Sequence, residues 1–182
     1  RKMVFNPDGL SLSKYQDLLS ESTEKMDLGK YIQRMKEMNL PQSIFIDCTS
    51  SEDVVAHYAE VLESSVSIVT PSKIANSGKL SNYKKLREIA KRRNVRFFYE
   101  TNVGAGLPVI NTLTDLLTSG DRILRIEAVL SGTLSFIFNT FKEDTRFSDI
   151  VKEAMQRGYT EPDPRIDLSG KDVARKLLIL AR

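Results

Sequence analysis

SIFIDCTSSEDVVAHYAEVLESSVSIVT, residues 43–70, decides the fold of this chain. The stretch begins and ends with short β-branched or aromatic runs, at 43–49 and 66–70, which are typical of buried strands. Between them, residues 51–64 carry apolar side chains at helical spacing, and Ser51 is a suitable N-cap. A strand, a helix and a second strand in this order predict a parallel pair joined by a right-handed crossover.

The same alternation continues on both sides of this unit. Further strands are expected at 95–100 and 123–130, and the second of these has the pattern of a sheet with one solvent-exposed face. The first three strands are nearly continuous apolar runs, as in a parallel sheet covered on both faces. Helices are expected at 14–22, 28–38, 80–93, 107–120 and 171–182. The pattern predicts an α/β fold with a domain boundary near residues 101–106.

The composition is that of an ordinary globular protein. The chain has 182 residues, of which 41% are hydrophobic and 28% are charged, so the disordered, collagen-like and disulfide-scaffold classes are excluded. Cys48 has no partner for an internal disulfide, which fits a reducing cytosol, and we expect it to be a small buried residue. With His57 the only histidine, a cysteine-rich or histidine-rich zinc site is excluded, and His57 is interpreted as a surface or boundary residue.

Charge and hydropathy favour neither nucleic acid nor membrane as a partner. The net charge is only +3, and the basic run at 84–93 is interpreted as the solvated face of a helix. No apolar run approaches the roughly 18 residues of a membrane span, and a cytoplasmic location is expected. The chain starts almost inside the fold and stops inside the apolar helix at 171–182, so we expect it to be a piece of a longer protein.

Residues 158–176, GYTEPDPRIDLSGKDVARK, form the first candidate site. Pro162 and Pro164 are expected to keep the chain extended, and Ser169 to open a helix on which Asp172 and Lys176 share one face. From spacing alone, a capping box at Ser169 with a surface ion pair is a sufficient explanation. The alternative is a carboxylate-rich site that grips an amino group and moves a proton at an oxygen.

Two further loops are candidates. ETNVGAGLP, residues 100–108, joins a strand to a helix through two glycines; its backbone suits an ion, although a simple βα turn explains it equally well. TPSK, residues 70–73, follows a strand, so Lys73 is expected at the carboxyl edge of the sheet, where open α/β folds bind ligands. DCTSS, residues 47–51, ends the neighbouring strand at the same edge.

These pieces together resemble the homoserine dehydrogenase family, most of all the dehydrogenase half of bifunctional aspartokinase/homoserine dehydrogenases. The resemblance covers nearly the whole chain and is most specific in 158–182, which fits the family signature without a gap. The carriers are IDCTSSEDV (46–54), VTPSKIAN (69–76), YETNVGAGLPVI (99–110), LSGTLSFIFN (130–139) and GYTEPDPRIDLSGKDVARKLLILAR (158–182). The family signature begins at Ala154, just before the last stretch. Its other residues lie within that stretch: Gly158, Tyr159, Asp163, Pro164, Asp167, Leu168, Gly170, Asp172 and Lys176.

The resemblance implies NAD- or NADP-linked interconversion of L-homoserine and L-aspartate 4-semialdehyde, a step toward threonine, methionine and isoleucine. It implies that residues 1–101 are the later part of a Rossmann-like nucleotide-binding domain. Residues 102–182 would then be the start of an α+β catalytic and dimerisation domain, with a homodimer or higher homo-oligomer as the assembly. The substrate would be a small amino acid.

Family roles are carried over to matching positions only. Lys176 resembles the lysine that transfers a proton at the substrate hydroxyl, Lys73 the lysine between nicotinamide and substrate, and Asp172 their orienting partner. The implied substrate contacts are Glu161, Asp167, Thr133 and Tyr159. The implied cofactor contacts are Thr49, Ser50, Lys73 and, near the adenosine ribose, Arg1. The implied sodium ligands are the carbonyl groups of Glu100, Val103, Ala105 and Leu107.

The sequence departs from the family pattern at two places. Only one lysine, Lys73, follows Ser72, where the family often has two. The G-x-G-x-x-G turn is absent, so we expect these 182 residues alone to bind NADP(H) poorly and to turn over slowly. Two other interpretations stay open: a non-catalytic oligomerisation module, and a dehydrogenase for another small aldehyde.

Overall fold

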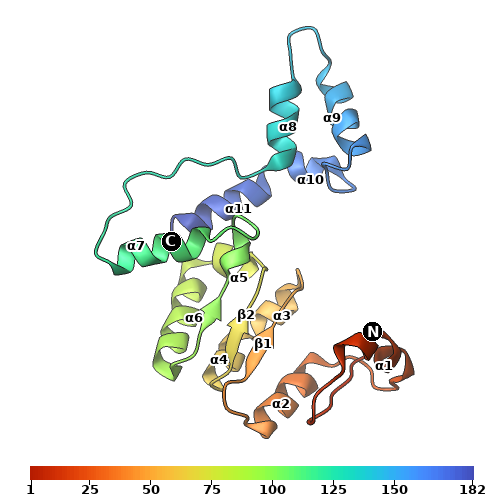
Figure 1. Ribbon diagram of the computed structural model, residues 1–182, viewed down its shortest axis with the longest axis vertical. Coiled ribbons are helices and arrows are strands. Elements are labelled where there is room, and N and C mark those ends of the chain that lie inside the picture. Colours follow the sequence, from red (N-terminus) through yellow and green to blue (C-terminus); the bar gives the residue numbers. More distant parts are fainter. The chain divides into compact units, whose positions relative to one another are not determined.

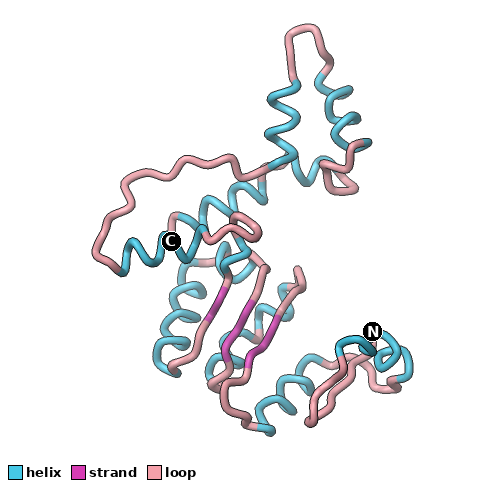
Figure 2. The backbone as a smooth tube through the Cα atoms, in the orientation of Figure 1, coloured by secondary structure: helices cyan, strands magenta, loops and turns pink.

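The computed structural model describes residues 1–182, and its elements alternate between helices and short strands (Figure 1). Three strands form one sheet in the order β1-β2-β3 (Figure 2). β1 and β2 are parallel, with Phe45 opposite Ile68. The strands are β1 (Ile44–Ile46), β2 (Ser67–Val69) and β3 (Phe97–Phe98). The predicted α/β class with a parallel sheet is therefore confirmed.

The helices before β3 match the predicted periodicity closely. Helix α2 (Leu28–Met38) begins at Asp27, whose side chain accepts a hydrogen bond from Lys30 N, and ends at Asn39 with φ 42°. The others are η1 (Leu12–Lys14), α1 (Tyr15–Glu21), α3 (Glu52–Ala56), α4 (Tyr58–Glu63), α5 (Ile74–Ser77) and α6 (Leu80–Arg93). The helix expected at 51–64 is divided at His57, and Ser51 precedes it without a side-chain cap.

Most helices after β3 were not predicted from the sequence. The 3₁₀ turn η2 (Glu100–Asn102) precedes α7 (Val109–Thr118), which lies inside the expected helix at 107–120. The remaining elements are α8 (Gly132–Thr140), α9 (Phe147–Gln156), α10 (Pro164–Leu168) and α11 (Lys171–Leu180). Of these, only α11 was expected, although Ile150, Val151 and Ala154 of α9 have the spacing of an amphipathic helix that the sequence analysis missed.

The chain divides into two compact units, and neither is a single continuous segment. The first unit comprises Arg1–Ile46, Ser51–Val69 and Lys85–Phe97. The second comprises Asp47–Ser50, Thr70–Lys84 and Phe98–Arg182. The sequence predicts a single boundary between residues 101 and 102. The compact units are each made of several segments and do not test that boundary, which stays a prediction.

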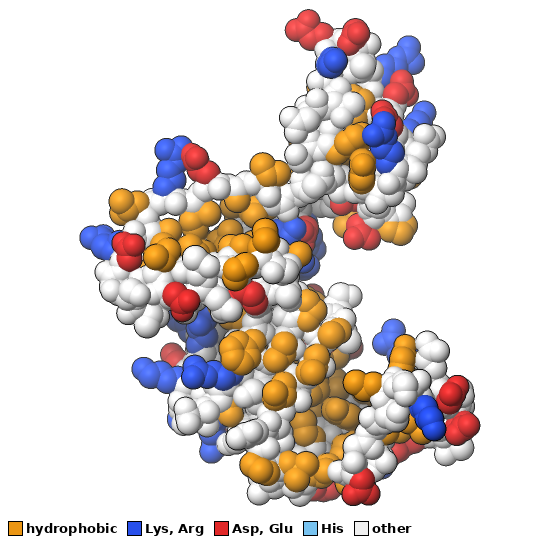
Figure 3. Space-filling model, in the orientation of Figure 1, with side chains coloured by type: hydrophobic (Ala, Val, Ile, Leu, Met, Phe, Trp, Pro, Cys, Tyr) orange, Lys and Arg blue, Asp and Glu red, His pale blue; other side chains and the backbone are white.

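The core of the first unit lies on one face of β1 and β2. Tyr58 is fully buried and its ring meets Phe97 edge to face, with centroids 5.7 Å apart. Phe45 of β1 is buried, whereas Ile44 and Ile46 are 58% and 67% exposed. Apolar side chains gather on the surface of this unit (Figure 3). The expectation of a sheet covered on both faces is therefore wrong for β1 within this chain.

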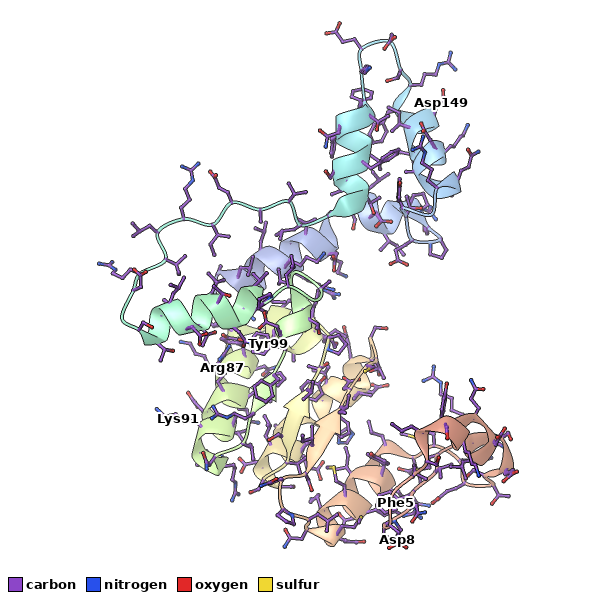
Figure 4. The ribbon with its side chains drawn as sticks, in the orientation of Figure 1. Phe5, Asp8, Arg87, Lys91, Tyr99 and Asp149 are labelled. Atoms are coloured by element: carbon purple, nitrogen blue, oxygen red, sulfur yellow. The ribbon has the colours of Figure 1, made fainter.

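The basic run at 84–93 is the solvated helix face that its spacing predicts. On α6, Leu86, Ile89 and Ala90 are buried, while Arg87 and Lys91, one turn apart in Figure 4, are exposed. Arg92 and Arg93 both pair with Glu63 of α4. The arginine hydrogen bonds and charges lower the pKa of Glu63, and the dominant effect is the hydrogen bond from Arg93.

The second unit has two apolar clusters. In one, Val103, Ile110 and Ile179 pack together, and Tyr99, labelled in Figure 4, contacts them. In the other, Ile137 of α8 packs against Ile150 and Ala154 of α9. The first cluster therefore joins the loop after η2 to α7 and α11, and the second holds α8 to α9.

Four local predictions are wrong, and the first three fail for a physical reason. Residues 123–130 form no strand, since no neighbouring strand pairs with them. Pro164 starts α10, because a proline fits the first helical position, and Asp163 caps that helix. Ser169 ends α10 instead of opening α11, whose N-cap is Gly170 at φ 66°, so the capping box does not form. Cys48 is exposed rather than buried. No helix has the length and apolar character that a membrane span requires.

Candidate active site

The Asp172 carboxylate brings the two predicted lysines together. Its Oδ1 lies 3.1 Å from Lys73 Nζ and its Oδ2 lies 2.8 Å from Lys176 Nζ. Asp172 and Lys176 are one turn apart on α11, as their spacing predicts, whereas Lys73 comes from the N-cap of α5. The side chains of Lys73 and Lys176 are 26% and 21% exposed, so both ammonium groups are partly shielded from water.

The electrostatic environment keeps Asp172 ionised. Partial burial is the largest single effect and by itself raises the pKa of this carboxyl. The hydrogen bonds from Lys176 and Lys73, together with their positive charges, outweigh burial and leave the pKa below its ordinary value of 3.8. Asp172 is therefore an acceptor of hydrogen bonds at neutral pH, not a proton donor.

Lys176 has a second partner that the sequence does not indicate. Its Nζ donates a 2.7 Å hydrogen bond to the carbonyl oxygen of Leu130, which lies near the end of the irregular segment 121–131. Leu130 also packs against the cluster around Ile179, which lies one turn beyond Lys176. The irregular segment is thus tied to α11 at the position of Lys176.

The four predicted substrate contacts lie together around Asp167. The Thr133 hydroxyl donates to Asp167 Oδ1 at 3.3 Å and also to the carbonyl oxygen of Tyr159. Asp167 Oδ2 accepts the backbone N–H of Glu161 at 2.9 Å. The start of α8, the loop after α9 and the helix α10 are joined at this carboxylate. Glu161 and Tyr159 are exposed, so their side chains are free to meet a ligand.

These two groups of residues are linked by the chain itself. Leu130, which accepts the hydrogen bond from Lys176, is only three residues before Thr133, and three extended residues span about 10 Å. Between them, Ser131 caps α8 by accepting a 3.1 Å hydrogen bond from Leu134 N. The paired lysines and the carboxylate of Asp167 are therefore joined through a short stretch of backbone at the start of α8.

The loops after β1 and β2 are held by buried polar contacts. The Asp47 side chain is 2% exposed and accepts a 2.7 Å hydrogen bond from Thr49 N. The Thr70 hydroxyl donates to the carbonyl oxygen of Asp47 at 2.9 Å. Thr49 and Ser50 are exposed beside these anchors, at the carboxyl edge of the sheet where the sequence places the 47–51 loop, and their contact with a cofactor stays a prediction.

The glycine turn at 100–108 is a tight loop that Glu100 fastens to α7. The Glu100 carboxylate accepts the N–H groups of Ile110 and Asn111 at 2.9 and 2.8 Å, a side-chain cap that the sequence analysis missed. Gly104 and Ala105 have positive φ, 85° and 51°. Because the Glu100 side chain is committed to α7, only its carbonyl oxygen is available to an ion.

Arg1 lies in the other compact unit from these loops. It belongs to the first unit, where its carbonyl oxygen accepts a 3.2 Å hydrogen bond from Met26 N. Its role as a cofactor contact stays a prediction. The residues that sequence reasoning missed are Leu130, which acts through its backbone, and the buried asparagines 76 and 102.

Family models for two homoserine dehydrogenase domains match the chain. The model of the homoserine dehydrogenase NAD binding domain matches residues 2–100, and that of homoserine dehydrogenase matches residues 108–182.

The chain belongs to the homoserine dehydrogenase family.

Curated relatives agree with this membership. The chain is 48% identical over 182 residues to bifunctional aspartokinase/homoserine dehydrogenase 1, chloroplastic, of Arabidopsis thaliana, with 100% of the chain and 20% of the relative covered. It is 42% identical over 178 residues to a homoserine dehydrogenase of Schizosaccharomyces pombe, with 95% and 47% covered. The chain thus spans about a fifth of the bifunctional relatives and about half of the monofunctional one.

Solved structures show the same homoserine dehydrogenase architecture. A hyperthermophilic archaeal homoserine dehydrogenase in complex with NADPH superposes with a TM-score of 0.75 at 28% identity, covering 93% of this chain and 51% of that one. A Candida auris protein of unknown function superposes with a TM-score of 0.89 at 36% identity, covering 98% and 51%. The Rossmann-like character predicted for the first part of the chain is thereby confirmed.

Proposed function

We propose that the protein carrying these residues interconverts L-homoserine and L-aspartate 4-semialdehyde with NAD or NADP. The observation that carries this proposal is the shared carboxylate of Asp172, which holds Lys73 and Lys176 side by side. Family membership supplies the reaction class, and these two ammonium groups supply the proton chemistry at the substrate oxygen. The reaction would serve the synthesis of threonine, methionine and isoleucine.

Lys176 is proposed to move the proton. Oxidation of an alcohol releases a hydroxyl proton, and in the reverse direction the new alkoxide oxygen needs one. Leu130 O and Asp172 Oδ2 hold the Lys176 nitrogen, and its remaining N–H is available to an aldehyde oxygen. In reduction, that N–H polarises the aldehyde and becomes the hydroxyl proton. In oxidation, the neutral amine takes the proton back.

Asp172 and Lys73 are proposed to orient the reacting groups. Ionised Asp172 accepts hydrogen bonds from both lysines and fixes the separation of their nitrogen atoms. Lys73 uses one N–H on Asp172 Oδ1, which leaves two for substrate or cofactor oxygens. A fixed approach of this kind is what a hydride transfer requires from the protein.

The substrate amino group is proposed to bind near Asp167. An α-ammonium needs acceptors. Asp167 on α10 supplies a carboxylate, and the backbone N–H of Glu161, which carries the second carboxylate, is hydrogen-bonded to it. Thr133 and the Tyr159 carbonyl complete a polar surface there. An amino-acid aldehyde is therefore a better substrate than an aldehyde that has no amino group, because the latter offers these acceptors no donor.

The chain's residues fit a dinucleotide and a monovalent cation. NAD or NADP, when bound, supplies the hydride acceptor or donor, and Thr49, Ser50 and Lys73 would contact it at the carboxyl ends of the strands. For sodium, the ligands would include two carbonyl oxygens that already accept one hydrogen bond each. Glu100 O accepts a hydrogen bond from Val103 N and Leu107 O accepts one from Val109 N, and each oxygen keeps a second lone pair. The carbonyl oxygens of Val103 and Ala105 would complete the donor set.

A homo-oligomer is part of the same proposal. Leu124 and Val129 are 90% and 80% exposed on the segment 121–131, which has no pairing partner within the chain. A second copy of this segment would bury both side chains. A cytoplasmic location and the absence of nucleic acid or membrane partners stay predictions.

The decisive experiment follows NADPH oxidation with aspartate 4-semialdehyde in wild type, Lys176→Ala and Lys171→Ala. Lys171 is the matched control, since it is an exposed lysine on the same helix. We expect Lys176→Ala to lower kcat by at least about a hundredfold, the usual effect of losing a general acid, and Lys171→Ala to change it little. Equal activity in Lys176→Ala and wild type would overturn the assignment.

A further inference from the structure

Two asparagine side chains form a buried hydrogen-bonded chain beneath Lys73. Asn102, at the end of η2, and Asn76, in α5, are 1% and 0% exposed. Asn102 Nδ2 donates to the carbonyl oxygen of Thr70 at 3.1 Å. Asn76 Nδ2 donates to Asn102 Oδ1 at 3.0 Å. None of the roles carried over from the family involves either residue.

The direction of this chain is fixed by its first member. The carbonyl oxygen of Thr70 can only accept a hydrogen bond, so the amino group of Asn102 has to face it. The Asn102 oxygen then faces Asn76, and Asn76 has to present its own amino group. An aspartate at position 102 would place a carboxylate oxygen against the Thr70 carbonyl. The position is therefore specific for an amide.

The Asn102 side chain is hydrogen-bonded to both ends of the segment 70–76, which carries Lys73. Thr70 lies three residues before Lys73 and Asn76 lies three residues after it. Ser77 N and Ser77 Oγ both donate to the Lys73 carbonyl oxygen, at 2.8 and 2.7 Å, so Lys73 is built into the same helical turn as Asn76. A shift of either end moves the Lys73 backbone.

We propose that Asn102 is a positioning residue for Lys73, which holds the 70–76 segment so that the Lys73 ammonium meets Asp172. The proposal rests on the dehydrogenase function proposed above. Removal of the Asn102 amide takes away the hydrogen bond to Thr70 O and leaves Asn76 Nδ2 buried without its acceptor, which favours movement of the segment. A displacement of about 1 Å at a positioned group lowers turnover by about a hundredfold.

The first test is a double-mutant cycle. We expect Asn102→Ala to lower kcat by about ten- to a hundredfold. In the Lys73→Ala background, Asn102→Ala should lower kcat no further, because a positioning residue acts only through the group it holds. The control is Ile150→Val, which loosens the packing of the α8–α9 cluster, a cluster that does not include Asn102. This substitution should lower kcat only slightly, and by the same factor with Lys73 present and with Lys73→Ala. An equal loss from Asn102→Ala in both backgrounds would overturn the proposal.

The second test needs no turnover. Reductive methylation of lysine amines, followed by mass spectrometry, reports how freely each ammonium meets solvent. Asn102→Ala should speed labelling of Lys73 several-fold and leave exposed Lys171 unchanged. A parallel rise at both lysines, or none at Lys73, would contradict the positioning role. If the full-length protein that carries these residues shows no dehydrogenase activity, the proposed function fails, whereas this labelling still decides whether Asn102 positions Lys73.

Discussion

The Lys176 ammonium donates a 2.7 Å hydrogen bond to the carbonyl oxygen of Leu130. A lysine ammonium has three N–H donors and no acceptor. Leu130 O takes one and Asp172 Oδ2 takes another, so the direction of the third is fixed by the tetrahedral nitrogen. A backbone carbonyl cannot rotate away as a side chain can, and the remaining N–H is therefore aimed by the fold.

Lys176→Arg is expected to be as inactive as Lys176→Ala. Arginine keeps the positive charge but cannot lose its proton, and its planar donors do not reproduce the tetrahedral arrangement on Leu130 O and Asp172. We expect kcat for homoserine oxidation to fall by about a hundredfold or more. Stopped-flow absorbance of the reduced nicotinamide measures it, and substantial activity in the arginine variant would show that charge alone suffices.

Asp172→Asn should flatten the acid side of the stability profile. The pKa of Asp172 is lower in the folded protein than its ordinary 3.8, so the ionised group stabilises the fold above that value. That contribution is lost as the pH falls through the lowered folded pKa. Because the side chain is 51% exposed, the effect is small. Urea unfolding between pH 3 and 7 measures it, with exposed Asp144→Asn as the control; identical slopes for both variants would disprove the linkage.

Asp167→Asn should weaken substrate binding more than turnover. Its two oxygens accept hydrogen bonds from Thr133 Oγ1 and Glu161 N, and the asparagine would keep this shape but lose the negative charge that an α-ammonium needs. A lost charge-assisted hydrogen bond amounts to about 1.5–3 kcal/mol, so we expect KM for homoserine to rise by about ten- to a hundredfold. Steady-state kinetics separate KM from kcat, and an unchanged KM would remove Asp167 from the substrate site.

Gly104→Ala should destabilise the turn at 100–108, whereas Gly106→Ala should not. Gly104 has φ 85°, and a Cβ there would lie 2.6 Å from Val109 Cγ2. The left-handed conformation alone costs about 1–2 kcal/mol for a residue with a Cβ, and the close contact adds to it. A Cβ on Gly106 meets nothing within 4 Å. Thermal unfolding of both variants provides the comparison, and equal Tm values would show that the turn relaxes freely.

Local periodicity predicts the first half of this fold and little of the second. Helices at 28–38 and 80–93 match the structure because caps and apolar spacing act within each helix. Residues 123–130 alternate like a strand, but pairing depends on a neighbour that local sequence does not specify. The segment 132–140 contains the run FIF, whose aromatic and β-branched side chains favour strand as readily as the helix that forms.

In the site too, local spacing predicts contacts within one helix but not contacts between distant segments. The spacing of Asp172 and Lys176 is sufficient to place them on one helical face. Only the resemblance connected Lys73 with them, since their meeting depends on how α5 packs against α11. Leu130 contributes a carbonyl oxygen, which any residue type has, so no side-chain pattern could have indicated it. Asn76 and Asn102 are recognisable as special only once their burial is known.

The guanidinium of Arg182 donates to the carbonyl oxygens of Asn76 and Gly78, and the first of these contacts joins residues 106 positions apart. Closing a loop of that length opposes folding by about 4 kcal/mol of chain entropy, beyond a length-independent part. Folds that depend on contacts of such long range form slowly. We therefore expect that during refolding the helical signal, which depends on local contacts, recovers before turnover does. A ligand that binds Lys73 and Lys176 together would bind only the folded chain and would therefore raise its stability by mass action.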